Sequence, residues 1–240
     1  MNLAQLAIPA VAIALPMAVF GEDVDSFLAA AGPTSSMEVV PHDLRLRTGY
    51  EDGRLDRTGK TDVRSGSQNE GMSATSLYYV FPIWKRWMRA ELGADLSTGS
   101  VKHQTGSGQE FDALYTYYGF HAGFGAGCSV WETEQSLVDL EAVPFAGAGW
   151  SIYDWKRPET AALGTTPNNQ GGGRYTDFGI AFRATAILGS GWQLGAEVAP
   201  FHRNGSMSYE DKSSKGKTLD YEFSDSVSGV RYSGAIGYRF

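Results

Sequence analysis

The stretch from Leu137 to Trp155 reads LVDLEAVPFAGAGWSIYDW, and its residues alternate between two kinds. From 138 to 152, the side chains at even positions are apolar: Val138, Leu140, Ala142, Pro144, Ala146, Ala148, Trp150 and Ile152. Odd positions include Asp139, Glu141, Gly147, Gly149 and Ser151. Because successive side chains of a β-strand point to opposite faces, this pattern predicts a long strand with one apolar and one polar face.

The same alternation recurs along the chain after Pro41. In 174–189, Phe178, Ile180 and Phe182 stand against Asp177 and Arg183. The segments 42–52, 70–82, 85–99, 110–131, 137–155, 174–189, 192–208 and 219–240 are predicted as eight strands. With 30 Gly and 12% aromatic residues the composition also favours strands and turns.

The predicted connections alternate between short and long. Pro82 to Trp84, Glu132 to Ser136 and Gly189 to Gly191 are short. The others are polar and longer: Gly53 to Asn69, Ser100 to Gln109, Lys156 to Gly173 and Tyr209 to Thr218. Tight turns alternating with long loops are typical of an outer-membrane barrel, whose turns face the periplasm and whose loops face outward.

The polar face carries charges of both signs. These are Arg45, Arg47, Glu51, Arg89, Glu91, Asp95, Asp139, Glu141, Asp177, Arg183, Glu197 and Arg231, together with Arg203, Asp225 and Arg239. Alternation alone leaves two arrangements open, since a soluble barrel turns its apolar face inward and a membrane barrel turns it to lipid. Balanced charges can pair inside a narrow lumen, so these residues are predicted to form a lumen charge network.

The tryptophans favour the membrane arrangement. Trp84, Trp87, Trp131 and Trp192 lie beside the predicted short turns, as an inner aromatic girdle would. Trp150 and Trp155, with Tyr50, Tyr153 and Tyr175, are expected near the loop ends as the outer girdle.

The C-terminal segment reads YSGAIGYRF, with Tyr232, Gly234, Ile236, Tyr238 and Phe240 on one face. It resembles the last strand of outer-membrane β-barrels, and residues 42–240 resemble the small OmpA-type and OmpX-type barrels. The segments AGFGAG (122–127) and FAGAGW (145–150) look like strands of the same superfamily. The resemblance implies an all-β, eight-stranded antiparallel up-and-down transmembrane β-barrel in the bacterial outer membrane. It also implies that Tyr232, Ile236, Tyr238 and Phe240 serve the barrel-assembly machinery as a signal.

Residues 1–20 are uncharged and largely apolar, which predicts a signal peptide at 1–21, with cleavage near Gly21 or as late as Gly32. A buried helix or retained anchor is the alternative. Residues 22–41 are expected to form an N-terminal extension, and 42–240 the barrel. No later window is long and apolar enough for a spanning helix, so a membrane location requires strands.

The residue patterns that several functions require are not found in this sequence. A net charge of −7 argues against nucleic-acid binding, and a single cysteine, Cys128, leaves no disulfide. No cofactor or metal site is expected, because His42, His103 and His121 are scattered. His202 lies four residues before Ser206, a spacing unlike that of lipid A deacylases. Gly127 to Trp131 begins like a nucleophile elbow but has Trp131 where glycine is required.

We therefore expect a monomeric, non-enzymatic outer-membrane barrel with a structural or surface-interaction role through its loops. The loop cations Arg54, Arg57, Lys60, Arg64, Lys212, Lys215 and Lys217 could contact lipopolysaccharide phosphates. The alternatives are a lipid-modifying outer-membrane enzyme, a narrow channel and, from another class, a soluble ligand-binding barrel.

Overall fold

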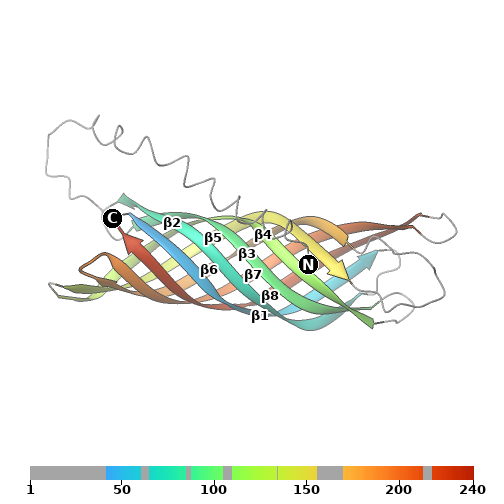
Figure 1. The fold of residues 1–240 in the computed structure, drawn as a ribbon, viewed down its shortest axis with the longest axis horizontal. Coiled ribbons are helices and arrows are strands. Elements are labelled where there is room, and N and C mark those ends of the chain that lie inside the picture. The colour runs from blue at the N-terminus through green and yellow to red at the C-terminus, as the bar shows by residue number, and fades with distance from the viewer. Residues whose placement is uncertain are drawn as a thin grey trace, which may run out of the picture. The chain divides into compact units, whose positions relative to one another are not determined.

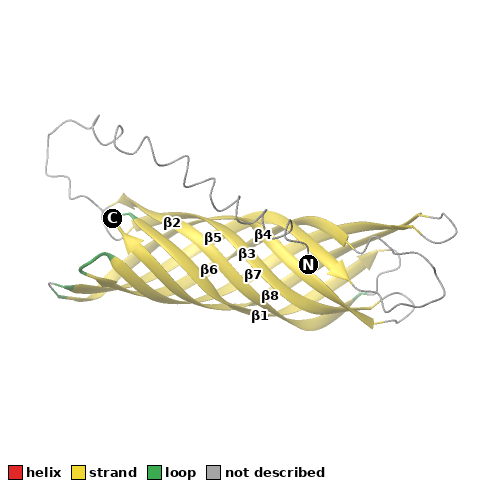
Figure 2. Cartoon of the chain, viewed as in Figure 1, coloured by secondary structure: helices red, strands yellow, loops and turns green. Residues whose placement is uncertain are grey.

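The computed structural model describes residues 42–60, 65–84, 88–104, 110–133, 135–155, 170–212 and 218–240. In these ranges the chain forms eight strands: β1 (Asp43–Lys60), β2 (Gly66–Trp84), β3 (Met88–Gln104), β4 (Glu110–Glu132), β5 (Ser136–Trp155), β6 (Gln170–Leu188), β7 (Trp192–Lys212) and β8 (Thr218–Arg239). Each strand pairs antiparallel with the next, and β8 pairs with β1, so the sheet closes into a barrel (Figures 1 and 2). The predicted eight-stranded up-and-down barrel is confirmed.

The strands are staggered around the ring. Following the hydrogen-bonded partners once around from Gly49 through all eight strands leads back to Gly59, ten residues further along β1. Such a stagger tilts the strands by about 40° from the barrel axis, and Figure 1 shows this oblique course. An eight-stranded barrel has an interior that its own side chains can fill.

The end of the barrel with the short turns is closed by backbone pairing. His42 N donates to Phe240 O at 3.1 Å and Phe240 N donates to His42 O at 3.0 Å, which joins the two ends of the ring. The β6–β7 turn uses Gly191 at φ 86°, a left-handed conformation that favours glycine. Two register shifts, at Pro82/Trp84 and Ser129/Trp131, also lie at this end.

β4 and β5 reach the loop end where predicted, but the other six strands extend further there, so the predicted loops Gly53–Asn69, Ser100–Gln109, Lys156–Gly173 and Tyr209–Thr218 are too long. The reason is that alternation continues there with polar side chains on the outer face. In β1, for example, Leu55 and Arg57 point inward while Arg54 and Asp56 are exposed. A strand segment whose outward residues are polar or glycine resembles a loop in its sequence, because it lacks the apolar residues that mark alternation.

The predicted signal segment, residues 1–21 or up to 32, and the predicted extension at 22–41 lie outside the described residues. Among the residues that are described, no helix is both long and apolar enough to cross a membrane.

Candidate functional site

Buried ion pairs fill the interior at the short-turn end. Arg45 donates to Asp43 at 2.6 Å and to Glu141 at 2.9 Å. Arg89 donates to the same Glu141 at 2.6 Å and to Asp139 at 2.9 Å. Arg239 Nε donates to Asp43 Oδ1 at 2.7 Å, so three arginines share three carboxylates here. Each charge in this layer has a partner, which offsets the cost of removing it from water.

A second layer lies at mid-height. Glu197 accepts hydrogen bonds from Arg47 and Arg183, each at 2.6 Å. Arg183 Nη2 also donates to Glu91 Oε1 at 2.9 Å. His121 also belongs to this layer, and its Nδ1 lies 2.7 Å from Asp95 Oδ2. The layer links residues from β1, β3, β4, β6 and β7 across the lumen.

Glu51 centres the third layer. Its carboxylate accepts from Arg203 at 3.0 Å and from Arg231 at 2.6 Å. Asp177 lies 3.7 Å from Arg203. The Arg203 guanidinium also stacks over Tyr117, 4.5 Å from the ring centroid. The aromatic ring therefore contacts the face of the guanidinium, while the carboxylates bind its edge.

Aromatic residues fill the loop end of the interior. Tyr115 and Tyr153 stack with ring centroids 5.5 Å apart, and Phe223 meets Tyr153 edge-on. Within this cluster Arg57 donates two hydrogen bonds of 2.7 Å to the Asp225 carboxylate and another to the Tyr115 hydroxyl. The lumen is therefore ionic toward the turns and aromatic toward the loops.

Every residue of the predicted lumen network lies on the inward face, and all but Asp225 belong to the three ionic layers, whereas Asp225 pairs with Arg57 in the aromatic cluster. Several buried polar residues were missed or misplaced: Arg57 was assigned to a loop, and Asp43, His121 and Glu70 were among those left out of the network. The signal for Arg57 was its parity, since it follows Arg45, Arg47 and Glu51 at even spacing along β1.

The outer face carries the large apolar side chains. Leu140, Ile180 and Ile236 have exposed fractions of 44%, 42% and 47%. Leu92, Phe120, Phe124, Phe182, Leu194 and Val198 are exposed as well. Inside and outside are therefore reversed from a soluble protein, in which a continuous apolar exterior of this extent is rare.

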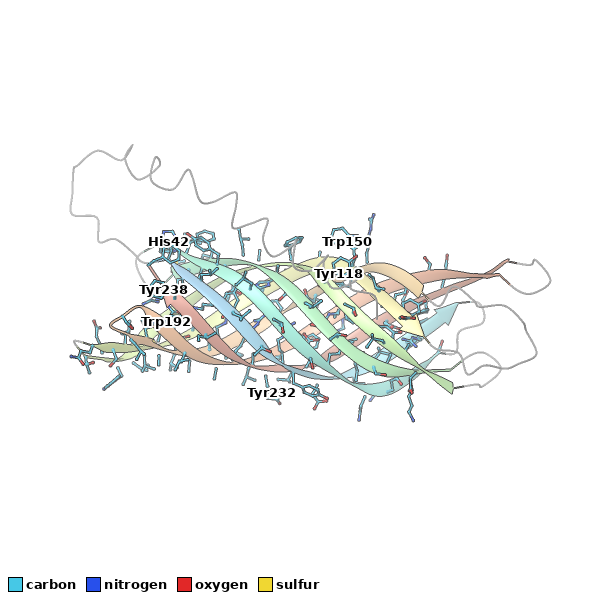
Figure 3. The ribbon with its side chains drawn as sticks, in the orientation of Figure 1. His42, Tyr118, Trp150, Trp192, Tyr232 and Tyr238 are labelled. Atoms are coloured by element: carbon cyan, nitrogen blue, oxygen red, sulfur yellow. The ribbon has the colours of Figure 1, made fainter. Side chains whose placement is uncertain are left out.

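Outward aromatic residues gather at two levels. Trp192 and Tyr238 lie with His42 near the C-terminal end of the barrel, whereas Tyr118, Trp150 and Tyr232 lie further toward the loops (Figure 3). Trp131 is also exposed. The side chains of Trp84, Trp87 and Trp155 lie outside the described residues.

The placement of Tyr153 and Tyr175 in the outer girdle was wrong. Both side chains are buried in the lumen, with exposed fractions of 0% and 4%. Both residues are at odd positions and share the inward face with Ser151 and Asp177. The alternation of the strand therefore indicates an inward side chain, and their position near a loop end was the wrong criterion.

One pair of chemically reactive types faces outward. His202 Nδ1 lies 2.8 Å from Ser228 Oγ, across the β7–β8 pair. The Phe178 ring packs beside the imidazole at 5.2 Å between centroids. Ser206, the residue considered with His202 in the sequence, lies on the same strand and is not the one that contacts it.

The fold and its two faces define a class of protein: a closed barrel with a charged, filled interior and an apolar exterior. No family model matches the chain, and no curated protein matches it. Solved structures similar to it include the outer membrane protein OprG from Pseudomonas aeruginosa, with 12% identity, 82% of this chain and 95% of that chain covered, and a TM-score of 0.38. Others are the outer membrane protease OmpT from Escherichia coli (8% identity, 86% and 99% covered, TM-score 0.44) and Ail, the attachment invasion locus protein of Yersinia pestis (15%, 82% and 98%, TM-score 0.33). Likeness at this level of identity indicates the fold and transfers no function.

Replacing Glu51 by Gln should lower the free energy of unfolding by about 3–5 kcal/mol, because two buried guanidinium groups lose their shared carboxylate. Denaturant titration of the refolded barrel measures this. Asp56→Asn is the control, since the Asp56–Arg54 pair is exposed and its loss should change stability little. Equal effects of the two variants would contradict a stabilising role for the lumen pairs.

Proposed function

We propose that this chain is a non-enzymatic barrel of the bacterial outer membrane that acts in envelope integrity or surface interaction through its loop end. The observation that carries the proposal is the reversal of faces, with paired charges inside and large apolar side chains outside. Lipid is the solvent that makes such an exterior favourable, and closure leaves no unpaired strand edge within it.

The height of the apolar exterior supports this placement. On β6 the outward residues are apolar from Phe178 to Leu188, and Thr176 and Arg174 follow toward the loops. Ten residues at about 3.3 Å each, on a strand tilted by about 40°, span about 25 Å along the axis. That is the height of the apolar band of outer-membrane barrels.

Beyond this band the outer face of β6, β7, β8 and β1 is polar, whereas β4 and β5 expose Leu114, Trp150 and Ile152 there. The outward residues are Arg54, Asp56 and Thr58 on β1, Asn204, Ser206 and Ser208 on β7, and Ser224, Ser226 and Ser228 on β8. These side chains suit water or lipid headgroups. In the proposed role the extended wall lifts the four connections at this end away from the membrane, where they meet their partner.

A narrow channel is disfavoured by the filled interior, since three ionic layers and an aromatic cluster occupy it along its length. Conductance measurements in planar bilayers test this, and steady single-channel openings would contradict the proposal.

A lipid-acting enzyme is the second candidate, favoured by one observation. The His202–Ser228 pair places a base within hydrogen-bond reach of a hydroxyl at the edge of the apolar band. Incubating the purified barrel with lipid A and following released fatty acid by mass spectrometry separates the candidates. Release that disappears in Ser228→Ala would replace the first proposal by this one.

An arginine on the outer face should cost most where the barrel meets the middle of the bilayer. Ala184→Arg should lower the free energy of unfolding in lipid vesicles by about 2–4 kcal/mol, and Thr176→Arg, eight residues away on the same face of β6, by about 1 kcal/mol or less. Denaturant titration in vesicles gives both values. In a soluble barrel both positions would face water, so equal small effects would contradict membrane insertion.

The loop end should be reachable from outside intact cells. In a Cys128→Ser background, Ser224→Cys should react with a membrane-impermeant maleimide on intact cells, whereas Thr133→Cys, in the β4–β5 turn, should react only after the outer membrane is permeabilised. Gel shift of the labelled protein reports both. The reverse order of labelling would overturn the orientation.

A further inference from the structure

Glu70 is a buried carboxylate that lacks a partner within the described part of the chain. Its side chain lies on the inward face of β2 with an exposed fraction of 4%, and its Oε2 atom has no hydrogen-bond donor. Every other buried carboxylate of the described lumen has an arginine nitrogen within 3.7 Å. An unpaired buried charge is costly, so this exception calls for a physical reason.

Glu70 lies beyond the apolar band, in the part of the barrel nearer the loops. Its register partner on β1 is Gly53. The neighbours of Gly53, Asp52 and Arg54, are polar and exposed on the outer face. In the proposed orientation this part of the wall stands outside the membrane, so the pH of the external medium acts on it.

The charges around Glu70 do not balance. The third ionic layer and the aromatic cluster beyond it together contain three described arginines and four described carboxylates: Arg57, Arg203 and Arg231 against Glu51, Glu70, Asp177 and Asp225. Arg203 and Arg231 both lie within 4.0 Å of Glu51 and of Asp177. Arg57 pairs with Asp225. One carboxylate is in excess, and it is Glu70.

The other groups that face Glu70 supply no positive charge. On β3 the residue at this level is the buried Val101, and β4, β5 and β6 contribute the buried tyrosines Tyr115, Tyr117, Tyr153 and Tyr175. A phenol is neutral below about pH 10. Burial raises the pKa of the Glu70 carboxyl to about 7, and the attraction of Arg203 offsets this only in part.

We propose that Glu70 is a proton switch for the loop half of the lumen, which packs tightly when this carboxyl is protonated and loosens when it is ionised. The protonated carboxyl carries no charge beside Tyr115 and Tyr117, whose hydroxyls it influences. The ionised carboxylate is an uncompensated charge next to an aromatic cluster, so it draws in water and competes with Asp225 for Arg57. The packing directly below the loops thereby depends on external pH.

The pH dependence has a definite sign. In the unfolded chain Glu70 ionises near its ordinary pKa of 4.5, whereas in the folded barrel its pKa is about 7. Between these values the folded barrel holds a proton that the unfolded chain has lost. The stability that this proton contributes is therefore complete below about pH 4.5 and is lost as the pH rises through about 7.

The test compares the wild-type barrel with Glu70→Gln, which keeps the shape of the side chain and removes its titration. Denaturant titration of the refolded barrels at about pH 5 and about pH 8 gives the unfolding equilibrium constants. The ratio of the wild-type constant to the variant constant should rise by at least tenfold between the two pH values. In Asp52→Asn, which removes an exposed carboxylate on the outer face of β1, the corresponding ratio should stay constant. A constant ratio for Glu70→Gln overturns the inference.

Infrared spectroscopy of the folded barrel provides a measurement that does not depend on the stability of a variant. With isotope-labelled glutamate, the wild-type protein at about pH 6 should show the band of one protonated carboxyl, which should vanish at about pH 8. Near-ultraviolet circular dichroism of the tyrosines should weaken over the same range. Glutamates that are all ionised at the lower pH would overturn the inference.

Failure of the switch is distinct from failure of the proposed function. Each protein is first checked for heat-modifiable gel mobility, which reports a folded barrel in lipid. A folded, inserted barrel in which Glu70 does not titrate removes only the switch, whereas a wild-type chain that does not insert removes the membrane proposal itself.

Discussion

The pairing of arginines with carboxylates inside a narrow ring is the constraint on which the rest of the structure depends. A charge in this interior has no bulk water to solvate it, so it is tolerated only beside an opposite charge. Glu51, Glu141 and Glu197 each meet two arginines from different strands, which ties opposite walls together. With most of the charged groups paired inside, the outer face is left to apolar residues.

Much of this could be predicted from the sequence because the side-chain period of a strand is two. Parity was enough to place Leu140 and Ile180 on the apolar face and Asp139 on the polar face, whereas the tryptophans were needed to decide which face points outward. The strand ends toward the loops could not be placed, since beyond Asp52 the outer face is polar and alternation no longer shows in hydropathy. Tyr153 and Tyr175 were misplaced because their nearness to a loop was weighed above their parity. Which arginine meets which acid depends on the stagger of the strands, which turn lengths in the sequence do not specify.

The two halves of the interior are filled by different interactions, ion pairs toward the turns and aromatic packing toward the loops. Toward the turns, layers of ion pairs fix strand against strand through directional hydrogen bonds. Toward the loops, Tyr115, Tyr153 and Phe223 pack as an apolar core would, with the Arg57–Asp225 pair enclosed among them. On the outside, the apolar band and the polar wall beyond it follow the same parity, so one alternation sets both the interior and the exterior of the barrel.

The location of the two register shifts limits how the chain can change in length. A single residue inserted in the middle of a strand would turn every later side chain to the opposite face, exchanging arginines with leucines. At Ser129/Trp131 the extra residue lies at the rim, where Val130 and Trp131 are both exposed and few charged partners remain. Insertions or deletions of an odd number of residues are therefore tolerable at the turn end of the barrel and in the loops. Within the strands, only an even number of residues can be inserted without reversing the faces.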